Sequence, residues 1–350
     1  KTPGVEDLVT ECETGDNGMT LYELSAYGVI GAITPSTNPA ETLICNTIGM
    51  LAAGNAVFFS VHPGAKHLSR LLVSELNQII AKSIGIENLI VTLREPSIES
   101  AQEMMLHPDV SLLVVTGGPG VVKQALQSGK KVIGAGAGNP PAFVDETADI
   151  KKAAQDIVLG ASLDNNILCI AEKSVVAMRQ IEPQLVQEMV KAGCVLIENQ
   201  QDIQRLVDLT VLPNGTPNKK FVGKNASVIL DAAHIPYNGD PRLIIMRTPK
   251  DHPFAVIEML MPILPVVTVD EGLDVCLMLE AGLHHTATMH SLNMERLNRM
   301  ARKMKTSIFV KNGPSYAGLG FSGEGTTTFT IATPTGESTT SARCFARRRR

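Results

Sequence analysis

The sequence lacks a strong excess of either charge, and it lacks any long hydrophobic run. Its 31 basic and 35 acidic side chains give a formal net charge of −4, so the chain has no overall basic character with which to recruit nucleic acid. The one basic run, four arginines at 347–350, lies at the very end and predicts a solvated tail. No stretch of 18 apolar residues occurs, so we expect no membrane span.

Closely spaced cysteines are also missing. The chain has six widely separated cysteines, and none forms a CxxC pair. This spacing excludes a disulfide framework or a zinc ribbon and favours a reducing compartment, the cytosol. The chain begins at Lys1 without a methionine or a signal-like apolar segment, and we expect it to be a piece of a longer protein at that end. The cysteines are Cys12, Cys45, Cys169, Cys194, Cys276 and Cys344.

What the sequence does contain is a regular alternation of strand and helix patterns. Between 27 and 138, continuous Val/Ile/Leu runs recur at intervals of roughly 25–30 residues, with helical segments such as 64–85 between them. Continuous apolar strands are buried on both faces, so the pattern predicts a parallel sheet covered by helices. A second α/β region follows, and 350 residues suffice for two domains. The polar first 25 residues carry turn signals and predict an extended segment and a hairpin.

Four polar or glycine-rich stretches follow the predicted strands of the first region. They are TPSTNP at 34–39, SVHPG at 60–64, TGGPG at 116–120 and GAGAGN at 134–139. Ligands of parallel sheets bind beyond the carboxyl ends of the strands, so these stretches are candidate binding loops. TGGPG precedes a helix, where glycine lets a phosphate approach free N–H groups. A plain tight turn explains TGGPG equally well.

A glycine-rich stretch near the end of the chain imitates a nucleotide-binding fingerprint. GLGFSG at 318–323 matches GxGxxG. The fingerprint requires a hydrophobic strand directly before it and a helix after it. Neither is predicted here, and a Thr-rich strand is expected at 326–334. We therefore interpret 318–323 as a connecting loop.

A single cysteine, Cys169, stands in the apolar turn ILCI between polar DNN and AEKS. A cysteine without further context is usually a buried small hydrophobe. A nucleophilic thiol needs its thiolate form, which a nearby helix N-terminus or cation supplies, and the DNN side chains could hydrogen-bond around the turn. The pair His284–His285 reaches Cys169 only through the fold. The His284–His285 pair is a candidate base, a structural turn or a pair of metal ligands. Because the sequence has no third ligand at metal-binding spacing, we expect no metal.

Together these motifs resemble the aldehyde dehydrogenase superfamily. Within it, the chain is similar to the CoA-acylating propionaldehyde and acetaldehyde dehydrogenases of bacterial microcompartments, on the propanediol-utilisation branch. The resemblance runs from YGVIGAITPSTNPAETL through KVIGAGAGNPPAFVDETAD and GASLDNNILCIAEKSVV to TSIFVKNGPSYAGLGFSGEG. It covers nearly the whole chain in order. It implies an α/β fold with a Rossmann-type nucleotide domain, an α/β catalytic domain and a small β oligomerisation arm.

The resemblance implies a catalytic role for four residues. Cys169 matches the nucleophile, which forms a thiohemiacetal with the aldehyde and then a thioester. Backbone N–H groups near Cys169 are expected donors to the oxyanion. The side-chain oxyanion donor falls on Thr37 by position or on Asn38 by residue type, and the two stay open. His285 matches the family's HHT segment and is expected to line the active site.

One departure from the hydrolytic relatives bears on the product. Those enzymes carry a Glu-Leu-Gly-Gly-Lys segment whose glutamate activates water. Ala135 takes the place of that glutamate in this chain. Without a base for water, the thioester should survive until a thiol attacks it, so CoA is the expected acceptor and acyl-CoA the expected product. A hydrolytic enzyme giving the free acid, or a non-catalytic scaffold that keeps the fold, are the alternatives.

The resemblance also places the cofactors, NAD and the co-substrate coenzyme A. Ser60 stands where relatives have the lysine that holds the adenosine ribose, so the choice of NAD over NADP rests on the resemblance alone. Glu258 matches the glutamate that holds the nicotinamide ribose. The full set of expected cofactor-binding residues is Thr34, Pro35, Ser60, His62, Pro63, Gly64, Thr116, Gly117, Gly118, Gly134, Ala135, Gly136 and Glu258.

The same resemblance predicts the domains and the setting. We expect an oligomerisation hairpin at 1–25, a dinucleotide-binding domain at 26–145, a catalytic domain at 146–325 and a returning oligomerisation strand at 326–350. About a hundred residues of the family's N-terminus are expected to be missing. The expected partners are an aldehyde, favouring propionaldehyde and then acetaldehyde, CoA, further copies in a dimer or tetramer, and microcompartment shell proteins. The expected location is the bacterial cytoplasm, inside a microcompartment.

Overall fold

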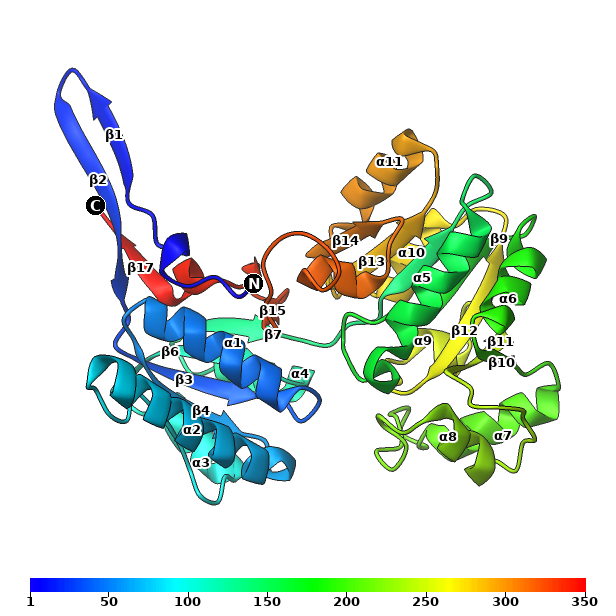
Figure 1. Cartoon of the computed structure of the whole chain (residues 1–350), viewed down its shortest axis with the longest axis horizontal. Coiled ribbons are helices and arrows are strands. Elements are labelled where there is room, and N and C mark those ends of the chain that lie inside the picture. The colour runs from blue at the N-terminus through cyan, green and yellow to red at the C-terminus, as the bar shows by residue number, and fades with distance from the viewer. The chain divides into compact units, whose positions relative to one another are not determined.

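The computed structural model describes all 350 residues and divides them into two compact units. The first unit comprises 1–136 and 325–350, and the second comprises 137–324 (Figure 1). This division lies nine residues before the predicted domain boundary at 145. The apolar segment Pro141–Val144 (β8) is a strand of the second unit's sheet, where it pairs with strands on both sides.

A five-stranded parallel sheet forms the centre of the first unit, in the order β5-β4-β3-β6-β7. The chain runs from β3 outward to β5 and then crosses to β6, so the strand order reverses between β3 and β6. The carboxyl end of that pair is a candidate ligand position, because a crevice opens where neighbouring crossovers diverge. The strands are β3 (Val29–Thr34), β4 (Ala56–Val61), β5 (Ile90–Thr92), β6 (Val110–Thr116) and β7 (Lys131–Ala135).

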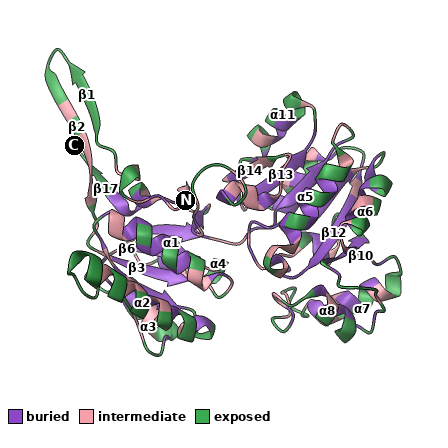
Figure 2. Ribbon diagram, viewed as in Figure 1, coloured by how far each residue is buried: buried purple, intermediate pink, exposed green.

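Helices cover this sheet as the sequence pattern predicts. The apolar strand residues are buried, while the helices show their polar faces to solvent (Figure 2). Proline occupies the first turn of α1 and α4, and Gly85 ends α2 in the left-handed conformation with φ 72°. The helices are α1 (Pro39–Ala52), α2 (Lys66–Ile84), α3 (Ile98–Leu106) and α4 (Pro119–Leu126), with the 3₁₀ turn η2 (Pro63–Ala65) leading into α2.

The first 25 residues form the predicted hairpin, and the end of the chain joins it. Strands β1 (Glu11–Gly15) and β2 (Gly18–Ala26) are antiparallel, and β17 (Ala346–Arg349) pairs with β2. The arginine run is thus not a solvated tail. Its side chains are exposed, but its backbone satisfies the otherwise unpaired edge of β2.

The Thr-rich segment is mostly irregular. Only Ile331–Ala332 (β15) forms a strand there, paired with Ser338–Thr339 (β16). The remaining short 3₁₀ turns of this unit are η1 (Val5–Asp7) and η5 (Ala342–Phe345).

The second unit is a seven-stranded, wholly parallel sheet in the order β10-β11-β12-β9-β8-β13-β14. Its other strands are β9 (Ser174–Met178), β10 (Cys194–Leu196), β11 (Leu243–Arg247), β12 (Ile263–Val269), β13 (Thr286–His290) and β14 (Ile308–Lys311). Its helices are α5 (Ile150–Ser162), α6 (Glu182–Lys191), α7 (Gln200–Thr210), α8 (Ala226–Ala232), α9 (Pro253–Val256), α10 (Leu273–Glu280) and α11 (Met294–Met304), with 3₁₀ turns η3 (Leu163–Asn166) and η4 (Ser315–Leu319). The expected α/β fold is present in both units.

The glycine-rich stretch near the end of the chain matches the expectation. Residues 318–323 connect η4 to the irregular segment before β15, with no helix after them, so the GxGxxG match is a connecting loop. No helix is long and apolar enough to cross a lipid bilayer.

Candidate active site

The turn before Cys169 is built from three consecutive residues in the left-handed conformation. Asp164, Asn165 and Asn166 have φ values of 47°, 52° and 64°. Short Asp and Asn side chains tolerate this conformation better than other side chains, because they hydrogen-bond to the local backbone. The polar residues of DNN therefore allow the chain to turn sharply after α5. Cys169 follows this turn.

Hydrogen bonds fix this turn from within. Asn166 is buried, and its amide donates to the carbonyl oxygens of Ala161 and Glu172 at 2.7 and 2.9 Å. Lys173 is buried as well, and its ammonium group donates to Asn166 O, Asn166 Oδ1 and Leu168 O at 2.7, 2.7 and 2.9 Å. A buried cation with three acceptors orients the backbone on the N-terminal side of Cys169.

Glu172, the charged residue that precedes Lys173, is also held by hydrogen bonds. Glu172 accepts hydrogen bonds from the backbone N–H and the hydroxyl of Ser315, at 2.8 and 2.7 Å. Both residues are fully buried. Burial raises the pKa of Glu172 to about 7, and the Ser315 donors oppose that rise. This contact ties the Cys169 turn to η4.

Backbone from a second segment packs directly against the nucleophile candidate. A Cβ atom added to Gly138 would lie 2.6 Å from the carbonyl oxygen of Cys169 and 2.9 Å from Cγ of His285. Only glycine fits at 138 without displacing one of them. Gly138 therefore brings Cys169 and His285 to one place, and its own N–H donates to Glu258 Oε1 at 3.2 Å.

The thiol of Cys169 is partly exposed and surrounded by opposing charges. Burial and the Glu258 carboxylate raise the pKa of Cys169 to about 12. Lys173 and the backbone N–H groups of Cys169 and Ile170 act in the opposite direction. Those N–H groups are the donors that the sequence predicted beside Cys169, and they favour a negative charge on sulfur or on a nearby oxygen.

His285 is buried and neutral. Burial lowers the pKa of its imidazole to about 4, and Lys173 acts in the same direction. Its Nδ1 lies 2.9 Å from the Thr286 hydroxyl, while Nε2 is buried with no hydrogen-bond partner. An unpartnered ring nitrogen in a polar site is available to a ligand. The neighbouring His284 is exposed, and no group of three or more His, Cys, Asp or Glu side chains is placed to hold a metal ion.

Glu258 is the third member of the cluster that contains Cys169 and His285. Burial raises the pKa of its carboxyl, and Lys173 and the Gly138 N–H oppose that rise. The second unit thus brings Cys169, His285 and Glu258 together, three residues spread over more than a hundred positions. Sequence reasoning named Asn166 only as a residue that hydrogen-bonds around the turn, included Gly138 only within the candidate loop 134–139, and missed Lys173. The signal for Lys173 was the charged pair Glu172–Lys173 standing between two apolar runs.

Thr37 and Asn38 belong to the first unit, in the turn between β3 and α1. The Thr37 hydroxyl donates to Asn38 Oδ1 at 2.7 Å, and the Asn38 amide donates to the Thr42 hydroxyl at 3.1 Å. Both side chains are therefore engaged with α1 in this structure. The choice between them as oxyanion donor stays a prediction.

The residues predicted to hold the dinucleotide cluster at the carboxyl edge of the first sheet. Thr34 ends β3 and Pro35 follows it. Thr116 ends β6 and is followed by Gly117 and Gly118, so both groups flank the position where the strand order reverses. The Thr34 hydroxyl is buried without a partner, and Gly118 precedes the first turn of α4. An orphaned donor and free helix N–H groups at a switch point fit a nucleotide diphosphate.

The other predicted cofactor residues lie at the same edge. Ser60 is buried in β4, and His62, Pro63 and Gly64 form the turn η2, in which the Gly64 N–H donates to His62 Nδ1 at 3.1 Å. At the end of β7, the Gly134 N–H donates to the Thr335 hydroxyl at 2.9 Å and a Cβ on Gly136 would touch Pro334. Ala135 is buried, and its carbonyl accepts from the Gly117 N–H at 3.2 Å.

Comparisons with known proteins agree with this arrangement. The sequence profile of the aldehyde dehydrogenase family matches residues 5–332. A CoA-propanoylating propanal dehydrogenase of Citrobacter freundii is 56% identical, over 100% of this chain and 76% of that protein. A solved propionaldehyde dehydrogenase of Rhodopseudomonas palustris, with bound CoA and an acylated cysteine, superposes with a TM-score of 0.98 at 53% identity, over 100% of this chain and 80% of that one.

A second solved structure is similar over the same range. It is a propionaldehyde dehydrogenase from the fucose-utilisation microcompartment of Clostridium phytofermentans, with a TM-score of 0.97 at 48% identity, covering 100% of this chain and 81% of that one. The family profile and the solved relatives agree with the α/β fold and its parallel sheets. The chain belongs to the aldehyde dehydrogenase family.

Proposed function

We propose that the protein is a CoA-acylating aldehyde dehydrogenase that converts a short aliphatic aldehyde, NAD⁺ and CoA into acyl-CoA, NADH and a proton. Propionaldehyde is the favoured substrate and acetaldehyde the next. The observation that carries the proposal is the Cys169 thiol at the end of a rigid left-handed turn, beside its own N–H, the Ile170 N–H and the unpartnered Nε2 of His285. Relatives named for this reaction support it.

Cys169 performs the first step. Its sulfur releases its proton to solvent and adds to the aldehyde carbon, so the carbonyl oxygen becomes an oxyanion. The N–H groups of Cys169 and Ile170 stabilise that charge, with Thr37 or Asn38 as the side-chain donor. Lys173 holds the turn so that these N–H groups keep their direction. NAD⁺ would supply the hydride acceptor when bound, and loss of a hydride from the thiohemiacetal carbon would leave a thioester on Cys169.

We infer that the nucleotide is bound by the residues of the first sheet's carboxyl edge, and the family resemblance assigns Glu258 of the second unit to the nicotinamide ribose. Thr34 and the amides before α4 suit the pyrophosphate, because both offer donors that the fold leaves unsatisfied. Glu258 suits the ribose hydroxyls as an acceptor, since its carboxylate is fixed by the Gly138 N–H. The dinucleotide-binding role of the first unit and the catalytic role of the second follow from these positions.

Thioester cleavage decides between transfer and hydrolysis. Ala135 carries a methyl group and no proton acceptor, so no side chain at that position can activate water. CoA then attacks the thioester carbon through its sulfur, and the thiolate of Cys169 leaves. The proton of the CoA thiol passes to Nε2 of His285, which is neutral at pH 7 because its pKa is lowered to about 4. Acyl-CoA is the product.

The setting of the enzyme is part of the proposal. Relatives from microcompartments support a location inside such a compartment, with shell proteins as partners. The exposed hairpin β1–β2 with β17 suits assembly into a dimer or tetramer, because it extends an edge strand whose backbone can pair or pack with another copy.

The test is a two-stage NADH assay. Protein is mixed with propionaldehyde and NAD⁺, NADH is followed, and CoA is then added. We expect a burst of about one NADH per active site, with turnover only after CoA. Cys169→Ala should lose both phases, whereas Cys12→Ala, which removes an exposed thiol on the hairpin, should keep them. Steady NADH formation without CoA would mean that water is the acceptor and would overturn the transfer mechanism. An inert Cys169 would favour the scaffold.

A further inference from the structure

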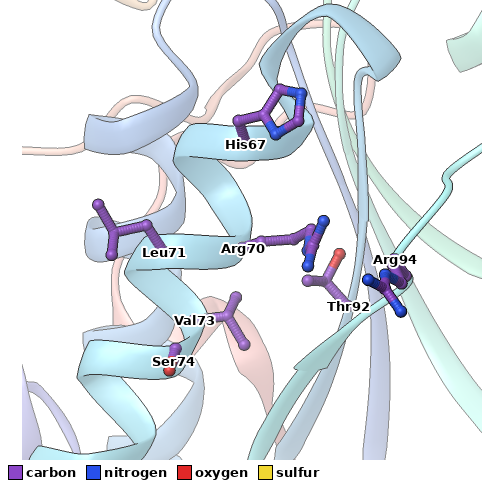
Figure 3. A pocket seen from close by; sticks show the side chains of 7 residues that line it. All are labelled: His67, Arg70, Leu71, Val73, Ser74, Thr92 and Arg94. Carbon is purple, nitrogen blue, oxygen red and sulfur yellow. The ribbon is translucent and has the colours of Figure 1, made fainter.

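A cavity of the first unit belongs to the proposed nucleotide site. It has a volume of ≈ 610 Å³ and lies between α2 and the end of β5, at the carboxyl edge of the first sheet (Figure 3). His67 and Arg70 line it from α2, and Thr92 and Arg94 line it from the end of β5 and the residues after it. The turn η2, which leads into α2, is part of the same edge.

In the second unit, the side chain of Asn165 connects the Cys169 turn with a distant segment that the proposed mechanism does not use. Its amide donates one hydrogen bond to Gly223 O at 3.1 Å and another to Asn225 Oδ1 at 2.8 Å. Both hydrogens of the amide are thereby used. Neither bond closes the turn itself. They fix the turn against the loop that precedes α8.

Gly223 packs against the same turn. It has φ 68°, in the left-handed region that favours glycine. A Cβ atom placed on Gly223 would lie 3.0 Å from Cδ1 of Ile167, two residues before Cys169. A side chain at 223 would therefore strain the backbone and also press on the turn.

Gly223 also holds the loop that carries Glu258. Its N–H donates to the carbonyl oxygen of Leu260 at 3.0 Å. Leu260 lies two residues after Glu258 and has φ 55°, a conformation that a leucine rarely adopts. A strained residue of this kind persists only where its surroundings hold it. Gly223 thus joins the Cys169 turn to the Glu258 loop through its carbonyl oxygen and its N–H.

Two separate links therefore connect Cys169 with Glu258. The first runs through Gly138, whose N–H donates to Glu258 Oε1 and whose backbone packs against Cys169 O. The second runs from the Cys169 turn through Asn165 and Gly223 to the Glu258 loop. A single contact leaves a pivot, whereas two contacts also restrict rotation of one segment relative to the other. Reacting groups need both restraints, because their distance and their angle matter.

We propose that Asn165 and Gly223 are positioning residues that set the placement of Cys169 relative to Glu258 for hydride transfer. The inference rests on the proposed function, in which Cys169 carries the thiohemiacetal and Glu258 holds the nicotinamide ribose. Addition of the aldehyde to the sulfur depends on the turn alone. Hydride transfer depends on both segments at once, because it needs donor and acceptor carbons at close range and in the right direction. Loss of the second link therefore slows the hydride step most.

Variants of Asn165 separate its hydrogen bonds from its backbone conformation. Glycine adopts the left-handed conformation without steric cost, so Asn165→Gly keeps the turn and removes both side-chain bonds. Asn165→Asp also suits a left-handed turn, but it places carboxylate oxygens against two acceptors. Asn88→Gly is the matched control, since Asn88 is an exposed asparagine with φ 58° in the first unit.

Amide hydrogen exchange of the ligand-free protein tests the link without the reaction. In Asn165→Gly, exchange should accelerate about fivefold in peptides covering 164–170 and also in peptides covering 258–261, and Asn165→Asp should show a larger change. Asn88→Gly should exchange like the wild type in both regions. Acceleration confined to 164–170 would mean that Asn165 does not restrain the Glu258 loop and would overturn the proposal.

Pre-steady-state NADH formation tests what the link does. With propionaldehyde and NAD⁺ but no CoA, the burst rate constant of Asn165→Gly should fall about tenfold, while the burst amplitude, which counts competent sites, should stay near the wild-type value. Propionaldehyde deuterated at the carbonyl carbon should give an isotope effect on this rate constant at least as large as in the wild type, because the hydride step itself is slowed. A fall in amplitude alone would indicate a merely structural role and would overturn the proposal, as would an unchanged rate constant in both Asn165 variants.

A second position keeps the test open if Asn165→Gly melts early. Asn225→Ala removes one of the two acceptors at an exposed site, and it should lower the burst rate constant in the same way by a smaller factor. A wild type that gives no NADH burst would refute the proposed function, and hydrogen exchange would still decide whether the link between the two segments exists.

Discussion

At the scale of single residues, the chemistry of Cys169 depends on what surrounds its sulfur. Glu258 opposes thiolate formation, while Lys173 and two backbone N–H groups favour it. The balance leaves the thiol protonated at neutral pH, since its pKa is raised to about 12. Any change that neutralises Glu258 or brings a positive charge beside it shifts this balance toward the thiolate.

The first prediction concerns the reactivity of this thiol without ligands. Below its pKa, the thiolate fraction rises tenfold per pH unit, so alkylation of Cys169 by iodoacetamide should accelerate about tenfold per unit from pH 7 to 10. Glu258→Gln should move the profile to lower pH by removing a negative charge. Peptide mass spectrometry separates Cys169 from the other cysteines. A wild-type plateau at or below pH 9 would contradict the prediction.

A second prediction concerns Gly138, whose missing side chain allows the site to close. Gly138→Ala places a methyl group within 2.6 Å of Cys169 O and 2.9 Å of His285 Cγ, so the nucleophile or the imidazole must shift. Displacements of this kind cost about 10²-fold in rate, and we expect a fall of that order in kcat with the fold retained. Gly15→Ala is the matched control, because nothing lies within 4 Å of a Cβ there. Unchanged kcat in both variants would refute the role of Gly138.

At the scale of elements, the left-handed turn and β13 do most to shape the site. The turn 164–166 delivers Cys169, and β13 begins directly after His285 and ends at His290. His290 is buried, with Nε2 unpartnered and Nδ1 3.9 Å from Asp156 Oδ2. Burial lowers the pKa of His290 to about 4, with Lys152 acting in the same direction. A buried neutral histidine makes this element sensitive to acid.

The sign of that sensitivity follows from proton linkage. The unfolded chain binds a proton at His290 below pH 6.5, whereas the folded chain does so only near pH 4. The stabilisation of the fold by a neutral, buried His290 is therefore present above pH 6.5 and is lost as the pH falls toward 4. At pH 5 the loss is about 2 kcal/mol. Urea unfolding measures the free energy of unfolding at pH 7 and pH 5 for both proteins. Between these pH values, this free energy should fall by about 2 kcal/mol less in His290→Gln than in the wild type. An equal fall in both proteins would refute the assignment.

At the scale of the whole molecule, the chain builds two parallel sheets and one small antiparallel arm. The arm unites the first 25 residues with the last four, which stand more than three hundred positions apart. Met19 and Leu21 lie two residues apart on β2, so they share one face, and their side chains are 64% and 41% exposed. Apolar side chains exposed on an arm suit an interface between copies.

The corresponding prediction concerns assembly. Met19→Glu with Leu21→Glu should convert the wild-type oligomer into a monomer, because charges would be buried without partners. Light scattering coupled to gel filtration measures the mass. Ile79→Glu, at an equally exposed apolar position on α2 (59% exposed), is the matched control and should leave the oligomer intact. A monomeric wild type, or an oligomer that tolerates both arm substitutions, would contradict the assignment of the arm.

The sequence by itself determined the layers and the candidates for chemistry. Continuous apolar runs can only be strands buried on both faces, so the parallel sheets and their carboxyl-edge loops followed from local pattern. Cys169, His285 and Glu258 followed from resemblance, without any sign of how they meet. The sequence did not show that the short run Pro141–Val144 pairs with strands far along the chain, because register between distant strands leaves no local trace.

Only the tertiary structure decided what surrounds each functional group. In the sequence, Lys173 and Glu172 look like an ordinary pair of exposed charges. In the structure, both are buried and hold the Cys169 turn through hydrogen bonds. The sequence predicted a solvated tail for the arginines at the end of the chain, but in the structure their backbone pairs with β2. Arg70 and Arg94 stand apart in the sequence and meet at one cavity. Burial, charge balance and strand pairing arise from contacts between distant residues, so they emerge when the chain folds.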